Sequence, residues 1–262
     1  MSYPIAVLIV LAAGLAAALV GVVLDRNLTL ESRRRHHEVG SQIFQLTGIM
    51  YSVLLAFVFS EVWTEYNTAA QAINTECSAM HGTAMLANTL PHDDARRINA
   101  ALLNYTHIVL RQEWRAMRDR QRTPEAAEAL RGALTAAAQA PPGEVKAQIL
   151  QLLAEAHAAR ETRLFQMGLT IPPAIWVVVI IIGVTLIGFV LLSATEPPGT
   201  VVLSASFTIS IAMVLVLVRM LDYPFEGALA LGNDDFQKIQ RQLGTLLISE
   251  TNNASIPWRE PK

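Results

Sequence analysis

Four long apolar stretches set the limits on what this chain of 262 residues can fold into. A helix needs about 20 apolar residues to cross the ~30 Å hydrocarbon core of a bilayer. Only the second stretch contains a charge, Glu61, close to its end. The sequence therefore predicts an all-α integral membrane protein with four transmembrane helices. The predicted spans are residues 5–24, 44–63, 174–193 and 201–218.

The composition agrees with this class and excludes others. Hydrophobic residues make up 52% of the chain and charged residues 16%, whereas about a quarter of a typical soluble domain is charged. The net charge of -2 gives no reason to expect nucleic acid as a partner. A single cysteine, Cys77, excludes an intrachain disulfide, so burial in the core and the bilayer must supply the stability.

The first stretch could instead be a secretory signal peptide, which would be removed from the mature protein. Two features favour a retained span: no Lys or Arg precedes it, and about 20 apolar residues exceed the usual apolar region of a signal peptide.

The part between the second and third spans has a different composition, rich in Ala, Leu, Arg and Glu, without a strand pattern. Because no helix breaker occurs from Ser60 to Gly82, the second span is expected to continue beyond the membrane as a helix. Further helices are predicted just after Pro91, from Thr123 and Pro124, and over residues 144–166. The predicted organisation is a hairpin over 1–63, a helical extramembrane domain over 64–168, a hairpin over 169–221, and a polar, loop-like tail over 222–262.

Signatures of catalysis are missing from the sequence. It contains no Gly-rich phosphate loop, HExxH, nucleophile elbow or CxxC. Cys77 and His81 are one helical turn apart, but this is at most half of a metal site and no second pair exists. We therefore expect no enzymatic activity, no metal and no cofactor.

The second span carries two helical rows of different chemistry. Gly48, Ser52, Ala56 and Ser60 are small and recur every fourth residue, as in helices that approach one another closely in lipid. This row could pack within one subunit, or between several copies arranged around an axis. In the second case apolar side chains such as Ile49 and Val53, with Leu54 and Phe57 nearby, could form a constriction that gates by dewetting.

The second span ends in two acids one turn apart, Glu61 and Glu65, beside Trp63 and Tyr66. These residues either mark the water interface with an aromatic belt or place a ring of carboxylates at a pore mouth, which would favour cations. The basic run "RRRHH", residues 33–37, lies on the opposite side. It either forms a competing positive cluster, since rings of Arg favour anions, or sets topology or binds lipid headgroups.

Two motifs follow the fourth span. In "LDYPFEG", residues 221–227, Pro224 fixes a turn, Phe225 can anchor it, and Asp222 is available to a cation. In "GNDDF", residues 232–236, the side chains of Asn233, Asp234 and Asp235 could bind calcium, although calcium takes 6–8 oxygen ligands and a solvated loop is the simpler interpretation.

Three segments resemble the bestrophin-like membrane proteins of bacteria and plants, distant relatives of the bestrophin anion channels. They are "YSVLLAFVFSEVWTEYNTAAQAINTE" (51–76), "LLNYTHIVLRQEWRAM" (102–117) and "LDYPFEGAL" (221–229). The resemblance implies a homopentamer with a central pore lined by the second span, cytoplasmic termini and a cytoplasmic helical part. It places the pore neck near Gln45, Ile49 and Val53, of which two are apolar and none is aromatic. The acids of "GNDDF" come later and are fewer than in the calcium clasp of bestrophins.

Charge alone leaves the membrane orientation open, because four basic residues on one side face four on the other. The two sets are Arg26, Arg33, Arg34 and Arg35 against Arg160, Arg163, Lys238 and Arg241. The resemblance breaks this tie by placing residues 64–168 inside the cell, in a multi-pass protein of the bacterial inner membrane.

The leading functional hypothesis is an oligomeric passive ion channel of bestrophin type, selective for anions by resemblance, with lipid and inorganic ions as its partners. One alternative is a cation channel with Glu61 and Glu65 at the mouth. Another is a non-conducting membrane scaffold or envelope-stress protein whose helical domain recruits a partner.

Overall fold

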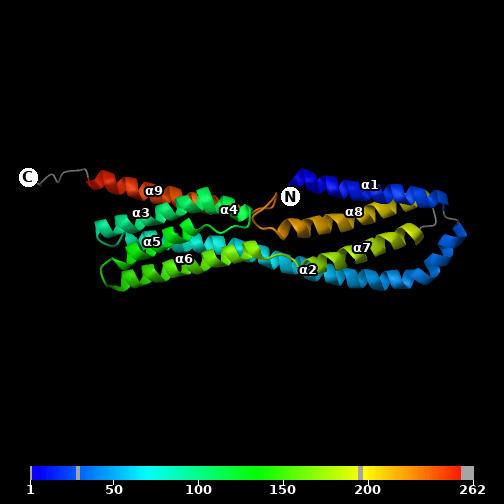
Figure 1. Ribbon diagram of the computed structural model, residues 1–262, viewed down its shortest axis with the longest axis horizontal. Helices are drawn as coiled ribbons and strands as arrows, with labels where there is room; N and C mark the ends of the chain where they lie inside the picture. The colour runs from blue at the N-terminus through cyan, green and yellow to red at the C-terminus, as the bar shows by residue number, and fades with distance from the viewer. Residues whose placement is uncertain (1, 28–29, 194–196, 255–262) are drawn as a thin grey trace, which may run out of the picture. The chain divides into compact units, whose positions relative to one another are not determined.

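The computed structural model describes residues 2–27, 30–193 and 197–254, and the side chains of 2–24, 41–192 and 201–248. Over these residues every regular element is a helix, which confirms the predicted all-α class (Figure 1). The elements are α1 Tyr3–Asn27, α2 Leu30–Ala87, α3 His92–Ile108, the π-helix η1 Val109–Glu113, α4 Trp114–Arg118, α5 Pro124–Ala138, α6 Glu144–Gly168, α7 Pro173–Ser193, α8 Pro197–Leu221 and α9 Asp234–Ala254.

The chain divides into two compact units. The membrane unit consists of Met1–Tyr66 and Leu169–Ala230. The helical unit consists of Asn67–Gly168 and Leu231–Lys262. The long helix α2 contributes residues to both, so the expectation that the second span continues as a helix beyond the membrane is confirmed.

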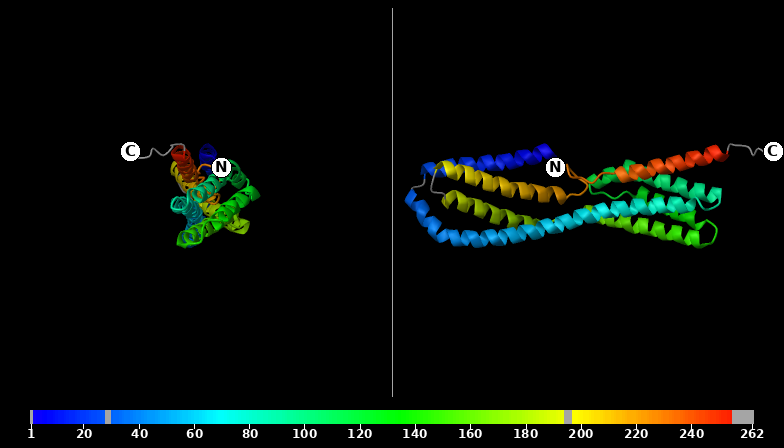
Figure 2. Two further views of the ribbon diagram at one scale, coloured as in Figure 1. Left: turned by 90° about the vertical axis from the view of Figure 1, so that its left-hand side faces the viewer. Right: turned by 180° about the vertical axis from the view of Figure 1, so that it is seen from behind.

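Four helices, α1, α2, α7 and α8, contain stretches long and apolar enough to cross a membrane. In the membrane unit α1 lies alongside α8, as Figure 2 shows from behind. Gly14 makes this close approach possible, because a Cβ atom there would meet Cγ1 of Ile209 at 2.6 Å.

The membrane unit has two buried apolar clusters. One contains Tyr51, Val179, Leu186 and Ile211, and the other contains Val62, Val218 and Leu221. Several Ser and Thr hydroxyl groups on these helices bond to the backbone of their own helix. The Thr185 hydroxyl, for example, donates to the carbonyl of Ile181 at 2.8 Å. Such local bonds suit a bilayer, where no water is present to satisfy a polar group.

The helical unit is built on close packing of α3 against α5 and α9, and of α5 against α6. Small side chains recur on the buried face of α5 every three or four residues, and they let the neighbouring helices approach. The alanines are Ala126, Ala129, Ala133 and Ala137. Large side chains fill the remaining core, among them Ile98, Leu102, Leu130, Ile149, Leu153, Phe236 and Leu243.

Several predicted helix starts are confirmed. Helix α3 begins directly after Pro91, α5 begins at Pro124 and α6 begins at Glu144. Asp93 and Asp94 lie in the first turn of α3, where a helix N-terminus favours negative charge. Thr123 occupies the position before α5, and its side chain makes no capping hydrogen bond.

Two segments outside the predicted helices contain helix. Residues 25–43 connect the first two predicted spans, and α2 already begins within them, at Leu30. The tail was expected to be loop-like, whereas it contains α9, Asp234–Ala254. The reason is a sparse apolar stripe: Phe236, Ile239 and Leu243 share one buried face among polar neighbours.

Some sequence predictions lie outside the described residues. They concern residues 194–196 of the short connection before α8, the side chains of "RRRHH" at 33–37, and the last residues, 255–262.

Candidate functional site

The membrane part of α2 presents an unpartnered face. Gln45, Ile49, Val53, Phe57 and Glu61 recur every fourth residue, and all five are exposed on the chain. Ile49 is 57% exposed, Val53 51% and Phe57 71%. Large apolar side chains this open require lipid or another subunit to cover them.

The packing of the rest of the helix explains this exposure. Tyr51 and Val62 are buried in the two apolar clusters, and Val58 packs against both. These residues lie on the side of α2 opposite the exposed row, because successive residues are about 100° apart around a helix. The chain itself therefore uses one side of α2 and leaves the other open.

The small-residue row also faces outward. A Cβ atom at Gly48 would meet nothing within 4 Å. Ser52, Ala56 and Ser60 are exposed, and the Ser52 hydroxyl donates to the Gly48 carbonyl at 2.8 Å. Within the described chain this row is open to a neighbour.

The spacing of both rows has a geometric consequence. Residues four apart form a line inclined by about 26° to the helix axis. A helix that presents such a line to a central axis must therefore be tilted. Small residues at the same spacing favour right-handed crossings of about 40° in membranes. One tilt can thus turn the Ile49 row inward and the Gly48 row toward a neighbouring helix.

An open apolar groove of about 550 Å³ adjoins these rows. Its lining comes from α2 and α8 and from Leu186 of α7. The lining includes Phe44, Gln45, Gly48, Ile49, Ser52, Val53, Phe207, Ser210, Ile211 and Val214. A groove of this kind beside a small-residue row suits the side chains of another helix.

The acids at the end of the row differ in environment. Glu61 is exposed, whereas Glu65 is half-buried. Between and beside them Phe59, Trp63 and Tyr66 stack, with ring centroids 6.3 and 6.2 Å apart. The Tyr66 hydroxyl donates to the Leu229 carbonyl at 3.0 Å. The aromatic residues thus fix this end of α2 to the turn after α8.

That turn is the "LDYPFEG" motif. Asp222 is 3% exposed, and its Oδ1 accepts a hydrogen bond from the backbone N–H of Ile171 at 2.8 Å. Phe225 is buried, and Gly227 has φ 84°, a conformation that favours glycine. The structure thus gives Asp222 a local task in joining the turn to the segment before α7. Its use by a cation stays a prediction.

The residues proposed for calcium form the start of α9. Asn233 Oδ1 accepts from the side-chain amide of Gln237 at 2.8 Å, and Asp235 pairs with Lys238 at 2.8 Å. Acids in a first helical turn are stabilised by the helix dipole. In the part of the chain that the structure describes, no three His, Cys, Asp or Glu side chains gather as metal ligands. Cys77 is buried and His81 exposed.

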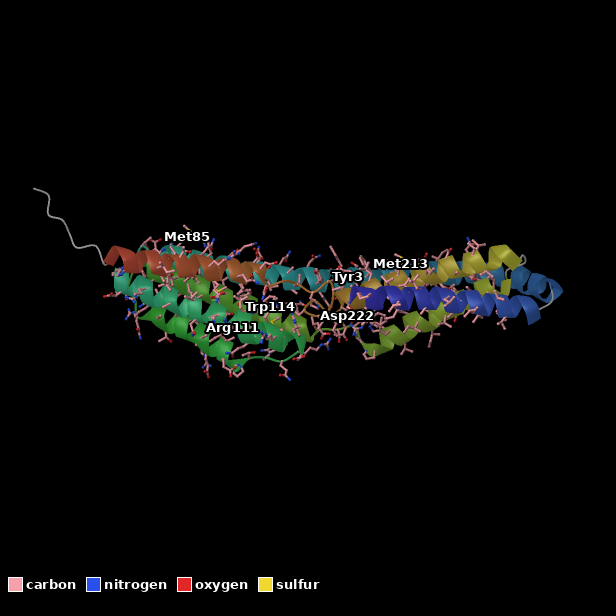
Figure 3. The ribbon with its side chains drawn as sticks, turned by 90° about the horizontal axis from the view of Figure 1, so that it is seen from above. Tyr3, Met85, Arg111, Trp114, Met213 and Asp222 are labelled. Atoms are coloured by element: carbon pink, nitrogen blue, oxygen red, sulfur yellow. The ribbon has the colours of Figure 1, made fainter. Side chains whose placement is uncertain are left out.

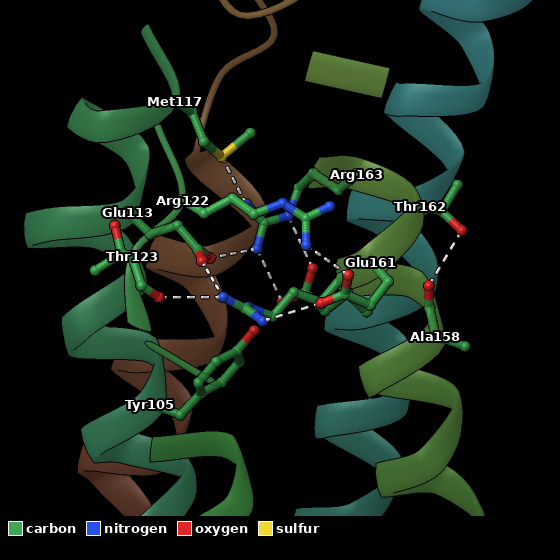
Figure 4. A network of polar contacts seen from close by, with 11 residues as sticks. Tyr105, Glu113, Met117, Arg122, Thr123, Ala158, Glu161, Thr162 and Arg163 are labelled. Atoms are coloured by element: carbon green, nitrogen blue, oxygen red, sulfur yellow. Dashed lines mark hydrogen bonds and ion pairs between the residues drawn. The ribbon is translucent and has the colours of Figure 1, made fainter. Parts of the chain in front are cut away.

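Sequence reasoning missed a buried ionic network in the helical unit (Figure 4). The Arg163 guanidinium bonds to Glu76 Oε2 at 2.9 Å and to Glu113 Oε2 at 2.8 Å. Arg160 pairs with the other oxygen of Glu113, and the Tyr105 hydroxyl donates to Glu76. All five side chains are almost inaccessible to solvent. Two cations and two anions thus balance inside the unit.

The network shifts the pKa values of Tyr105 and Arg163. Burial raises the pKa of the Tyr105 phenol well above its usual value, and the negative charge of Glu76 adds to this. Burial alone would lower the pKa of Arg163, but Glu76 and Glu113 outweigh it and raise that pKa. Arg160 and Arg163 therefore serve as core charges of the folded unit.

A signal for the network was present in the sequence. Glu76, Tyr105 and Glu113 all lie in the segments that carry the resemblance, 51–76 and 102–117. Each of these segments contributes an acid, Glu76 or Glu113, to the network. A charged residue on an apolar helical face indicates a buried partner of opposite charge.

Comparisons with known proteins agree with the fold. The structure is similar to a variant of a bacterial bestrophin homologue from Klebsiella pneumoniae, with a TM-score of 0.75 at 15% identity over 91% of this chain and 98% of that one. It is also similar to the crystal structure of a membrane protein, with a TM-score of 0.73 at 17% identity over 91% and 98% of the two chains. At such identities these similarities establish the fold.

The sequence comparison establishes the family. No relative is found among curated protein sequences. The family model described as Bestrophin-like domain, however, matches residues 11–236, which is most of the chain. This match begins within α1 and includes the whole of α2, α7 and α8 and of the part between them. The chain therefore belongs to the Bestrophin-like domain family.

Proposed function

We propose that the protein is a homo-oligomeric passive ion channel whose pathway is lined by α2. The observation that carries this proposal is the row Gln45, Ile49, Val53 and Phe57, which is exposed on an otherwise packed helix. Membership in the Bestrophin-like domain family supports it, because the resemblance to bestrophin channels implies a pore lined by the second span. By the same resemblance the oligomer is a pentamer in the bacterial inner membrane.

In this proposal the pathway has two parts. Ile49 and Val53, with Gln45 and Phe57 above and below, form an apolar constriction that excludes water when it is narrow. Glu61 and Glu65 lie at the inner mouth. The small row Gly48, Ser52, Ala56 and Ser60 packs against the neighbouring subunit, and the groove beside it receives that neighbour.

Anions are the proposed permeant ions, on the ground of the family resemblance. Cations are the second candidate, and one observation favours them: Glu61 is exposed on the same row as Ile49 and Val53. A ring of such carboxylates would attract cations and repel anions.

The test is ion flux through purified protein in liposomes under an imposed salt gradient. The proposal predicts flux that empty liposomes lack, and the reversal potential gives the sign of the permeant ion. An intact oligomer without flux would contradict the proposal and favour the remaining hypothesis, a non-conducting scaffold.

A further inference from the structure

A basic concavity of about 480 Å³ lies on the helical unit. Three arginines line it: Arg111 from η1, Arg115 from α4 and Arg241 from α9. Figure 3 labels Arg111 on this part of the chain, together with the buried Trp114. The remaining lining consists of Leu110, Asn233, Gln237 and Gln240.

The π-helical turn explains why two arginines are presented here. The Trp114 N–H bonds to the carbonyl of Val109, five residues back, so the turn is wider than in an α-helix. Glu113 and Trp114 are both buried, although they are adjacent. Arg111 and Arg115, on either side, remain exposed. The π-helical turn thus places Glu113 in the buried network and leaves Arg111 and Arg115 on the surface.

The concavity carries uncompensated positive charge. Among the side chains that the structure describes, no carboxylate lies within ion-pair distance of Arg111, Arg115 or Arg241. Glu113 bonds to Arg160 and Arg163, and Asp235 bonds to Lys238. Asp234, next to Asn233, is exposed and does not line the concavity. The other polar groups of the lining are amides of Asn and Gln, which add hydrogen bonds without negative charge.

We propose that this concavity binds a phosphate group, carried either by a soluble polyphosphate or by a lipid headgroup. Guanidinium groups match phosphate oxygens with paired hydrogen bonds, and three arginines line this concavity. A volume of about 480 Å³ lies within the range of small-ligand sites, about 300–1,000 Å³. Binding here is independent of whether the protein conducts ions.

The two carriers are separated by the choice of probe. Full-length protein in nanodiscs of uncharged lipid is titrated with pyrophosphate in a calorimeter, and binding of anionic phosphatidylglycerol is measured by adding it to the nanodiscs. A saturable heat with pyrophosphate identifies a soluble ligand. Retention of phosphatidylglycerol that depends on the arginines, without pyrophosphate binding, identifies a headgroup.

Replacing Arg111, Arg115 and Arg241 by Gln tests the assignment. Each single variant should weaken binding about tenfold, because a hydrogen bond to a charged group is lost. The matched control is Arg118→Gln, an exposed arginine on α4 that does not line the concavity; it should bind like the unmodified protein.

Three results would overturn the proposal. One is the absence of saturable binding of both probes. Another is a triple variant that binds as tightly as the Arg118→Gln control. The third is a triple variant that dissociates into smaller species by light scattering, since the arginines would then hold subunits together.

Discussion

Arg163 on α6 donates from Nε to the carboxylate of Glu76 on α2 at 2.9 Å, and both side chains are fully buried. The guanidinium also lies over the rings of Trp114 and Phe236, 5.5 and 5.3 Å from their centroids. This one side chain therefore joins α2, α4, α6 and α9. Because Arg163 is buried, water cannot replace its carboxylate partners if they are removed. This buried charge therefore holds the helical unit together.

Removing Arg163 should destabilise the helical unit strongly. In Arg163→Met the carboxylates of Glu76 and Glu113 lose a buried partner, and breaking a buried ion pair costs about 3–5 kcal/mol. Denaturant unfolding in detergent measures the loss. The matched control is Arg122→Met, which breaks the exposed pair with Glu161 and should cost at most about 1 kcal/mol. Equal losses would show that the buried network does not stabilise the unit.

The raised pKa of Tyr105 predicts a loss of stability at alkaline pH. The folded state holds this proton more tightly than the unfolded chain, where the pKa is about 10. The contribution is complete below that pH and is lost as pH rises toward the folded pKa. Between about pH 9 and 11, stability should fall more steeply in the unmodified protein than in Tyr105→Phe. Parallel unfolding midpoints over this range would contradict the argument.

The close approach of α1 and α8 predicts different responses at two glycines. Gly14→Ala places a Cβ atom 2.6 Å from Ile209 Cγ1, where overpacking costs about 1–3 kcal/mol. A gain of up to about 1 kcal/mol in helix propensity offsets part of this. Gly188→Ala on α7 is the control, since its Cβ atom would meet nothing within 4 Å. The thermal unfolding midpoint should therefore be lowered in Gly14→Ala and not in Gly188→Ala. Equal midpoints in the two variants would contradict the prediction.

The acids at the end of the α2 row should influence ion selectivity. Glu61→Gln combined with Glu65→Gln removes negative charge at the proposed mouth, so the reversal potential should shift toward anions. Glu128→Gln, an exposed acid on α5, is the control and should leave it unchanged. If the double variant behaves like this control, the two acids do not face the pathway.

Much of the fold could be predicted from the sequence because the spans and helix starts are local signals. Long apolar runs locate α1, α7 and α8, and Pro91 and Pro124 locate two helix starts. Helix α9 was missed because its stripe of Phe236, Ile239 and Leu243 is short beside the membrane spans. Its burial depends on α3, which lies far away in the sequence.

The candidate site was predictable only in part. The spacing of Ile49, Val53 and Glu61 could be read from the chain, but their exposure depends on which side of α2 packs in the membrane unit. Asp222 was taken as available to a cation, whereas the structure also shows its bond to Ile171. The pairing of Glu76 with Arg163, 87 residues apart, could not be predicted because it is set by tertiary packing.

Cysteine accessibility at Val53 tests the central claim most directly, namely that the exposed row of α2 lines an ion pathway. The single native cysteine, Cys77, is first replaced by Ala, and Val53→Cys is introduced. A charged, water-soluble thiol reagent should then block flux through liposomes containing this variant. Val184→Cys on α7, 63% exposed on the same unit, should resist the reagent. Block in the second variant but not in the first would place the pathway elsewhere.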